Sequence, residues 1–256
     1  AEQVLESAIE AGVRYVDTAR AYARRDEDGH NERLIARVLD RMGRRADVLI
    51  GTKLGHRRDG DRFPVDASPA ALRKDCTDSL RALRSAQLEL AMLHFPDPLV
   101  PLEVSVGAMA ALREEGLIGH VGLCNIDAVQ FDTAMAIVPI SVVQHRHGPG
   151  TVVDAALLER CEQHGVPFLG YSPLGGTRRA APLEAISPTA ARIAERVGAD
   201  LAAVVLAGLL SMSPSIALVT GARRAESLAS SLSALDIPLD DGERRALAVE
   251  LAAPRA

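Results

Sequence analysis

The sequence lacks tryptophan and has only four phenylalanines and three tyrosines, so aromatic residues make up 3% of its 256 residues. An apolar fraction of 48% still supplies enough aliphatic side chains for a sizeable core. No apolar run approaches the roughly 18 residues that a transmembrane helix needs, and we expect no membrane partner. Because aromatic rings are so scarce, an aromatic side chain inside a functional motif carries more weight here than it would in an average chain.

Cysteine is also rare, and positive charge is not in excess. The three cysteines, Cys76, Cys124 and Cys161, are widely spaced, and no two have the spacing of zinc ligands or of a redox pair. We therefore expect a reducing compartment, the cytoplasm. The net charge of −5 argues against general binding of nucleic acids, which requires a basic surface.

Strand and helix patterns alternate along the whole chain. Such alternation indicates an α/β protein with a parallel sheet. A (β/α)8 TIM barrel takes about 250 residues, so we expect residues 1–256 to form one barrel domain. Only seven strands are predicted, with a helix ahead of the first, and we expect the first strand of the barrel to be missing from this sequence. The predicted strands are residues 13–16, 48–52, 88–93, 118–123, 141–144, 166–171 and 216–219.

Four chemically distinct side chains lie at the ends of the first three predicted strands. Asp17 and Tyr22 follow the first strand, Lys53 ends the second and His94 follows the third. In a parallel barrel these ends open on one face, where active sites form. Taken singly, each residue has an ordinary interpretation as a helix cap, a packing residue or a solvated charge. Their shared position favours a catalytic group.

In this order, Asp17, Tyr22, Lys53 and His94 resemble the catalytic tetrad of the aldo-keto reductase family. The resemblance implies an NADPH-dependent oxidoreductase that reduces a small aldehyde or ketone to an alcohol. It implies that Tyr22 is the general acid and that Lys53 lowers the tyrosine pKa, since a nearby cation favours phenolate. Asp17 would hold Lys53 charged, and His94 would place the carbonyl oxygen.

Two further groups of motifs resemble cofactor-binding segments of the same family. No Gly-x-Gly-x-x-Gly fingerprint follows a predicted strand, so a Rossmann site is absent. The segments Val-Gly-Leu-Cys-Asn (121–125), Val-Val-Gln (142–144) and Gly-Tyr-Ser-Pro-Leu (170–174) resemble those around nicotinamide and pyrophosphate. The residues that the resemblance implies as cofactor contacts there are Asn125, Gln144, Tyr171, Ser172 and Leu174.

The segment Val-Thr-Gly-Ala-Arg-Arg (219–224) resembles the family stretch that holds the 2′-phosphate of NADP. Arginine suits phosphate because its planar guanidinium donates hydrogen bonds in pairs, and a helix N-terminus adds a favourable dipole. The chain departs from the family pattern at Thr220, where proline is usual, and at 230–231, where the family has Glu-Asn. The contacts implied here are Gly221, Arg223, Arg224 and Ser227.

The substrate pocket is expected to include Leu54, His56, Phe95 and His147, together with the long connections 54–67 and 173–186. Two imidazoles in His-Arg-His (145–147) alternate along a strand, as in some metal sites. No third ligand with matching spacing is evident, so we expect no metal, because catalytic zinc takes three protein ligands.

Two other functions stay open from the sequence. The first is a regulatory or redox-sensing barrel that binds nicotinamide with little turnover, which single-turnover oxidation of the cofactor would distinguish. The second is a Schiff-base aldolase that uses Lys53, which borohydride trapping with a carbonyl substrate would distinguish.

Overall fold

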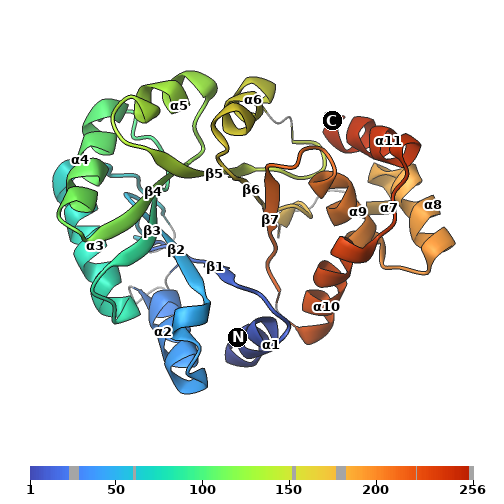
Figure 1. The fold of residues 1–256 in the computed structure, drawn as a ribbon, viewed down its shortest axis with the longest axis horizontal. Coiled ribbons are helices and arrows are strands. Elements are labelled where there is room, and N and C mark those ends of the chain that lie inside the picture. Colours follow the sequence, from blue (N-terminus) through green and yellow to red (C-terminus); the bar gives the residue numbers. More distant parts are fainter. Residues whose placement is uncertain (23–28, 60–61, 152–153, 177–182, 223, 254–256) are drawn as a thin grey trace. The chain divides into compact units, whose positions relative to one another are not determined.

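The chain falls into two compact units, residues 1–143 and residues 144–256. Figure 1 labels its helices and strands. A computed structural model describes residues 1–22, 29–59, 62–151, 154–176, 183–222 and 224–253. No helix in these ranges is long and apolar enough to cross a membrane. The expectation of one domain stays a prediction, as does the expectation about a missing first strand.

Unit 1 is an alternation of helices and parallel strands. Its strands β1 to β4 pair with one another in sequence order. The boundary between the two units falls within strand β5, because Gln144 is the first residue of unit 2. The elements are α1 (Glu2–Glu10), β1 (Tyr15–Asp17), α2 (His30–Met42), a 3-10 turn (Arg45–Asp47), β2 (Leu49–Leu54), α3 (Pro69–Leu83), β3 (Leu88–Leu93), α4 (Leu102–Glu114), β4 (Ile118–Cys124), α5 (Ala128–Met135) and β5 (Ile140–Arg146).

Unit 2 continues the alternation, and its strands β6 and β7 are parallel. The short helix α7 lies in a segment that the sequence predicts as part of a long connection, 173–186, whereas the helix predicted over 225–235 covers α10 and the start of the 3-10 turn that follows it. The elements are α6 (Ala155–His164), β6 (Phe168–Tyr171), α7 (Leu183–Ile186), α8 (Pro188–Val197), α9 (Leu201–Leu210), β7 (Ile216–Val219), α10 (Ala225–Ser233), a 3-10 turn (Ala234–Asp236) and α11 (Asp241–Ala252).

Local sequence signals account for many of these boundaries. Ser68 caps α3 by accepting a hydrogen bond from the Ala71 amide, and Pro69 follows at the first helical position. Asp127 and Gln130 form a reciprocal capping box at the start of α5. All seven predicted strands are present in the described part of the chain, and all seven predictions are thereby confirmed.

The strand register sets the positions of the candidate catalytic residues in unit 1. Asp17 is the last residue of β1 and pairs with Gly51 of β2. Lys53 lies one residue before the end of β2 and pairs with Met92 of β3. Parallel strands in this register bring their carboxyl ends to one edge, so side chains from β1, β2 and β3 meet there.

Gly51 is required by the close approach of a phenol from the neighbouring strand. A Cβ atom at position 51 would lie 2.4 Å from the hydroxyl oxygen of Tyr15 and 2.9 Å from two of its ring carbons. A methyl group therefore does not fit unless the ring moves. The Tyr15 ring is held against the β2 backbone two residues before Lys53.

We predict that Gly51→Ala lowers the free energy of unfolding by about 1–3 kcal/mol, the usual cost of overpacking a close contact. Gly107→Ala in α4 is the matched control, because nothing lies within 4 Å of a Cβ added there. That control is expected to gain roughly 0.5–1 kcal/mol, since alanine is the better helix former. Urea titration of both variants measures the difference, and equal stability of Gly51→Ala and the wild type would contradict the packing argument.

Candidate active site

Three of the four predicted catalytic residues meet at the ammonium group of Lys53. Its Nζ donates to Oδ2 of Asp17 at 2.5 Å, to the Thr18 carbonyl at 2.9 Å and to the Tyr22 hydroxyl at 3.4 Å. An ammonium has three donors, so these acceptors satisfy all of them. The side chain of Lys53 is 1% exposed and that of Asp17 is 8% exposed, so the ion pair is buried.

His94 completes the group from the end of β3. Its ring meets the Tyr22 ring edge-on, with centroids 5.9 Å apart and planes 82° apart. His94 is buried, whereas Tyr22 is 45% exposed. The structure therefore brings the predicted tetrad together, with Tyr22 as its most exposed residue.

A short loop after β1 carries Tyr22 and is tied to β2 by its backbone. The Thr18 amide donates to the Gly51 carbonyl at 2.8 Å, and the Arg20 amide donates to the Lys53 carbonyl at 3.1 Å. The Tyr22 amide turns back onto the Ala19 carbonyl at 3.0 Å. The loop thus runs alongside β2, and this course places the Tyr22 phenol next to Lys53.

Side chains from two helices hold the same loop, and the sequence analysis did not single them out. The buried Arg20 guanidinium pairs with Glu32 of α2 at 3.4 Å and with Asp78 of α3 at 3.6 Å. Glu32 is fully buried and also accepts a hydrogen bond from the Thr52 hydroxyl at 2.8 Å. The only sequence signal was the charge of Glu32 among the apolar positions of α2.

Burial and charge set the protonation states of the tetrad. Burial alone lowers the pKa of Lys53, but the adjacent Asp17 and Tyr22 outweigh it, so that the pKa lies above its usual value. Burial, with Lys53 and His56, lowers the pKa of His94 to about 2. At neutral pH the site therefore holds an ammonium and a neutral imidazole.

The pKa of the Tyr22 phenol is raised, whereas the family resemblance implies a lowered one. Burial raises its pKa, Lys53 lowers it and Asp17 raises it, and the net direction is upward from 10. Lys53 acts with the expected sign, but desolvation of the phenolate is the larger effect. Tyr22 consequently keeps its proton at neutral pH, as a proton donor must.

An aromatic cluster adjoins the tetrad and contains two of the predicted pocket residues. The His56 ring lies 4.7 Å from His94 and 5.3 Å from Phe95, measured between centroids. Phe63, from the same long connection as His56, lies 5.9 Å from His56 and is 47% exposed. Phe63 was not among the predicted pocket residues, although the scarcity of aromatic residues in this chain was a signal that could have identified it. Leu54 is fully buried at the end of β2.

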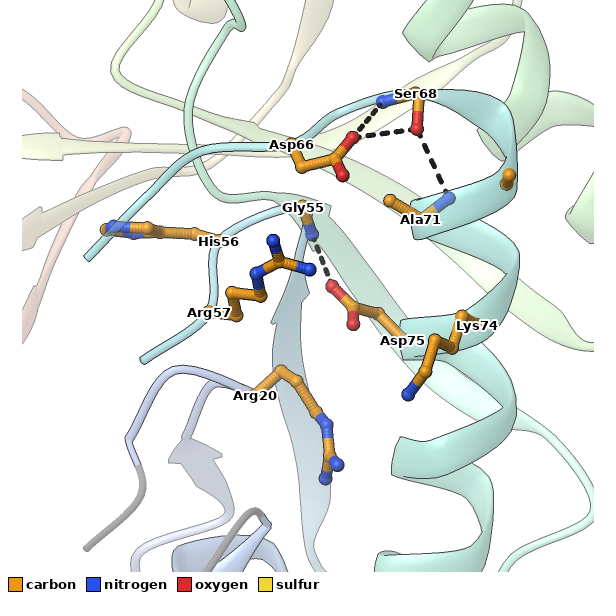
Figure 2. A pocket seen from close by; sticks show the side chains of 10 residues that line it. Arg20, Gly55, His56, Arg57, Asp66, Ser68, Ala71, Lys74 and Asp75 are labelled. Carbon is orange, nitrogen blue, oxygen red and sulfur yellow. Dashed lines mark hydrogen bonds between the residues drawn. The ribbon is translucent and has the colours of Figure 1, made fainter. Parts of the chain in front are cut away.

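A cavity of about 280 Å³ lies between the end of β2 and the start of α3. Figure 2 shows Asp75 of α3 accepting a hydrogen bond from the Gly55 amide, at 3.0 Å, with Arg20, Arg57 and Lys74 nearby. His56 borders both this cavity and the aromatic cluster, whereas no tetrad residue lines it. Charged side chains from the β1 loop, the β2 connection and α3 therefore gather beside the tetrad.

Of the predicted cofactor contacts, Asn125 is the one in unit 1. It follows β4 with a φ of +59°, and its side-chain amide donates to the His94 carbonyl at 3.0 Å. This contact links the end of β4 to the end of β3. Asn125 therefore lies next to the tetrad.

The other predicted cofactor contacts belong to unit 2. Gln144 is buried in β5, Tyr171 ends β6, and Ser172 has a φ of +53°. Leu174 packs against the apolar cluster around α8 and α9. Gly221 and Arg224 are exposed before α10, and Ser227 lies half-buried in its first turn. Arg223 lies outside the described residues.

His147, predicted as a pocket residue, is 1% exposed and packs inside unit 2. Its ring lies 5.9 Å from that of Phe168, and its Nε2 lies 3.4 Å from the Leu209 carbonyl. The structure therefore places it in the interior next to β6. A role in contacting substrate stays a prediction.

Comparison with known proteins identifies the family. The model of the Aldo/keto reductase family matches residues 1–248. The chain belongs to the aldo-keto reductase family. It is 30% identical to the aldo-keto reductase str7 of Strobilurus tenacellus, over 94% of this chain and 78% of that protein. It is also 30% identical to pyridoxine 4-dehydrogenase of Escherichia coli K12, over 93% of this chain and 82% of that enzyme.

A solved structure agrees with this assignment. The aldo-keto reductase from Klebsiella pneumoniae in complex with NADPH is 25% identical and superposes with a TM-score of 0.83, covering 100% of this chain and 86% of that one. The fold is thus the α/β TIM barrel of this family, and both the predicted family and the predicted fold class are confirmed. The protein is an oxidoreductase of the aldo-keto reductase family.

Proposed function

We propose that this protein reduces the carbonyl group of a small aldehyde or ketone to an alcohol with NADPH, and that Tyr22 donates the proton. Family membership supports NADP-dependent carbonyl reduction in general, and a structural neighbour was solved with NADPH bound. The observation that carries the finer proposal is the contact of the buried Lys53 ammonium with both Asp17 and the Tyr22 hydroxyl.

The residues present suit a nicotinamide dinucleotide. Asn125 offers a side-chain amide beside the tetrad, and the exposed Arg224 stands at the N-terminus of α10, where phosphate is favoured. Nδ1 of His94 is buried and has no hydrogen-bond partner among the described residues. Buried polar atoms are normally paired, so the His94 imidazole departs from a satisfied interior histidine. When bound, NADPH supplies the hydride for the carbonyl carbon.

The tetrad handles the proton and the developing charge on oxygen. Tyr22 gives its phenolic proton to the carbonyl oxygen as that oxygen becomes an alkoxide. Lys53 stabilises the phenolate left behind, because its charge is held by Asp17 within 2.5 Å. The neutral His94 imidazole orients the carbonyl oxygen without competing for the proton. General acid catalysis of this kind contributes roughly 10²–10⁴-fold.

The electrostatics argue against a Schiff-base aldolase. Such an enzyme needs Lys53 as a free neutral amine, and catalytic lysines of that type have a lowered pKa. Here the pKa of Lys53 is raised and all three ammonium donors are engaged. The regulatory alternative differs from the proposal only in turnover, and single-turnover oxidation of NADPH with a carbonyl panel separates the two.

We predict that Tyr22→Phe lowers the turnover number for carbonyl reduction by at least about a hundredfold, since the general acid is lost. NADPH affinity is expected to stay within a few-fold, because the phenol serves proton transfer. Steady-state rates and a fluorescence titration of NADPH on the same purified variant measure both. A variant with wild-type turnover would remove Tyr22 from the mechanism.

The second prediction concerns the choice of cofactor. If Arg223 or Arg224 contacts the 2′-phosphate, loss of this charge-assisted bond costs about 1.5–3 kcal/mol for NADPH and little for NADH. We therefore predict that the double change to alanine weakens NADPH at least tenfold more than NADH, at about 1.4 kcal/mol per tenfold. The effect should shrink with added salt, which screens exposed charges.

The matched control removes two exposed arginines from α11, Arg244 and Arg245, and is expected to leave the ratio of NADPH to NADH affinity unchanged. Equal losses for both cofactors in the Arg223/Arg224 variant would show that this pair does not select NADPH.

A further inference from the structure

A second phenol lies beside the tetrad, on the strand that carries Asp17. Tyr15 precedes Asp17 by two residues on β1, and alternate residues of a strand share one face. Its hydroxyl donates to Oδ1 of Asp17 at 3.2 Å, while Lys53 engages Oδ2 of the same carboxylate. The carboxylate is thus held through both of its oxygens.

The Tyr15 hydroxyl can act only as a donor in this contact. Burial, followed by the charge and hydrogen bond of Asp17, raises the pKa of Tyr15 far above its usual value. The phenol therefore keeps its proton throughout the working range of pH, and an ionised carboxylate only accepts. The hydrogen bond consequently has a fixed direction, from Tyr15 to Asp17.

The ring of Tyr15 is also fixed in space. It lies against Gly51 so closely that a Cβ at that position would meet its hydroxyl oxygen at 2.4 Å. Gly51 pairs with Asp17 across the two strands, and Lys53 follows two residues later on β2. Contact with the β2 backbone therefore fixes the Tyr15 ring, and the ring in turn fixes the position of the Asp17 carboxylate that its hydroxyl binds.

We propose that Tyr15 is a positioning residue of the reaction, whose hydroxyl holds the Asp17 carboxylate and, through it, the Lys53 ammonium against Tyr22. This inference rests on the proposed function of the tetrad. The resulting chain of contacts runs from Tyr15 to Asp17, from Asp17 to Lys53 and from Lys53 to the Tyr22 hydroxyl. Tyr15 thus acts through Asp17 and Lys53 and is not itself the proton donor.

Through Asp17, the Tyr15 hydroxyl also affects the pH profile of kcat. Asp17 raises the pKa of both Lys53 and Tyr22, and a hydrogen bond from Tyr15 draws part of the carboxylate charge away from them. Without that bond, the full charge acts on both groups, and the alkaline limb of the kcat profile moves to higher pH.

Three other titratable groups lie in or near the tetrad and could in principle affect the pH profile of kcat. Cys124 of β4 acts on Lys53 and Tyr22, but burial raises its pKa to about 12. His94 is neutral, with a pKa of about 2, and burial also lowers the pKa of its neighbour His56. Neither histidine therefore titrates on the alkaline limb, and we assign this limb to the coupled Tyr22 and Lys53 because their polar atoms are in direct contact.

The test is Tyr15→Phe, which removes one oxygen and keeps the ring against Gly51. The kcat for carbonyl reduction is expected to fall roughly tenfold or more, as for loss of a hydrogen bond to a charged group. The alkaline limb should move to higher pH, while the Kd for NADPH and the KM for substrate stay near wild type. Ser105→Ala is the control, because it also removes a buried hydroxyl that donates a hydrogen bond in unit 1, to the Ala67 carbonyl at 2.8 Å. It should leave kcat and the pH profile unchanged.

Wild-type kcat and profile in Tyr15→Phe would overturn the proposal. A fall in kcat with no shift of the limb would also overturn it, because a merely structural hydroxyl has that effect. A double-mutant cycle with Asp17→Asn provides a second test: Tyr15→Phe should have little further effect in that background, and additive losses would contradict action through Asp17. An inactive wild-type protein with every carbonyl offered would instead refute the proposed function itself.

Discussion

The buried ion pair between Lys53 and Asp17 is the interaction on which the rest of the site depends. Bringing two charges out of water is costly, and the pair survives only where geometry and further hydrogen bonds compensate. Here the Lys53 ammonium has three acceptors, and both oxygens of Asp17 are engaged. Removing either partner would leave a buried charge without its counterion, at a typical cost of about 3–5 kcal/mol.

The surrounding structure can be understood as support for this pair. The ends of β1 and β2 bring the two charges together, and the loop after β1 returns along β2 to place Tyr22 on the ammonium. The cation in turn helps keep His94 neutral. A phenol, a cation and a neutral imidazole then share one edge of unit 1, and these are the groups that the proposed mechanism uses.

Much of this arrangement could be predicted from the sequence, because it depends on strand ends. Apolar runs predicted β1, β2 and β3, and the polar residues at or just after their ends are Asp17, Tyr22, Lys53 and His94. Family resemblance added the roles of these four residues and the likeness of 121–125 and 170–174 to cofactor segments. These signals are local, so neighbouring residues suffice to read them.

Features that depend on three-dimensional burial could not be predicted. The raised pKa of Tyr22 results from burial of the phenol, which cannot be recognised from a sequence motif. Glu32 stands among the apolar positions of α2, but the sequence does not indicate that Arg20 forms a buried ion pair with it behind the loop. Phe63 lies in a long connection without periodicity, and the His-Arg-His pattern does not indicate the burial of His147 in unit 2.

The most direct test of the central claim is the pH dependence of kcat in Lys53→Met, in which a side chain of similar length lacks the charge. Lys53 lowers the pKa of Tyr22, and Asp17 raises it. Loss of the ammonium therefore leaves a weaker acid beside an uncompensated carboxylate. We predict that residual turnover falls by about 10² or more, in line with loss of efficient general acid catalysis, and that its alkaline limb moves to higher pH. A near-normal rate with an unchanged profile would contradict the account, since Tyr22 would then act without the Lys53 charge.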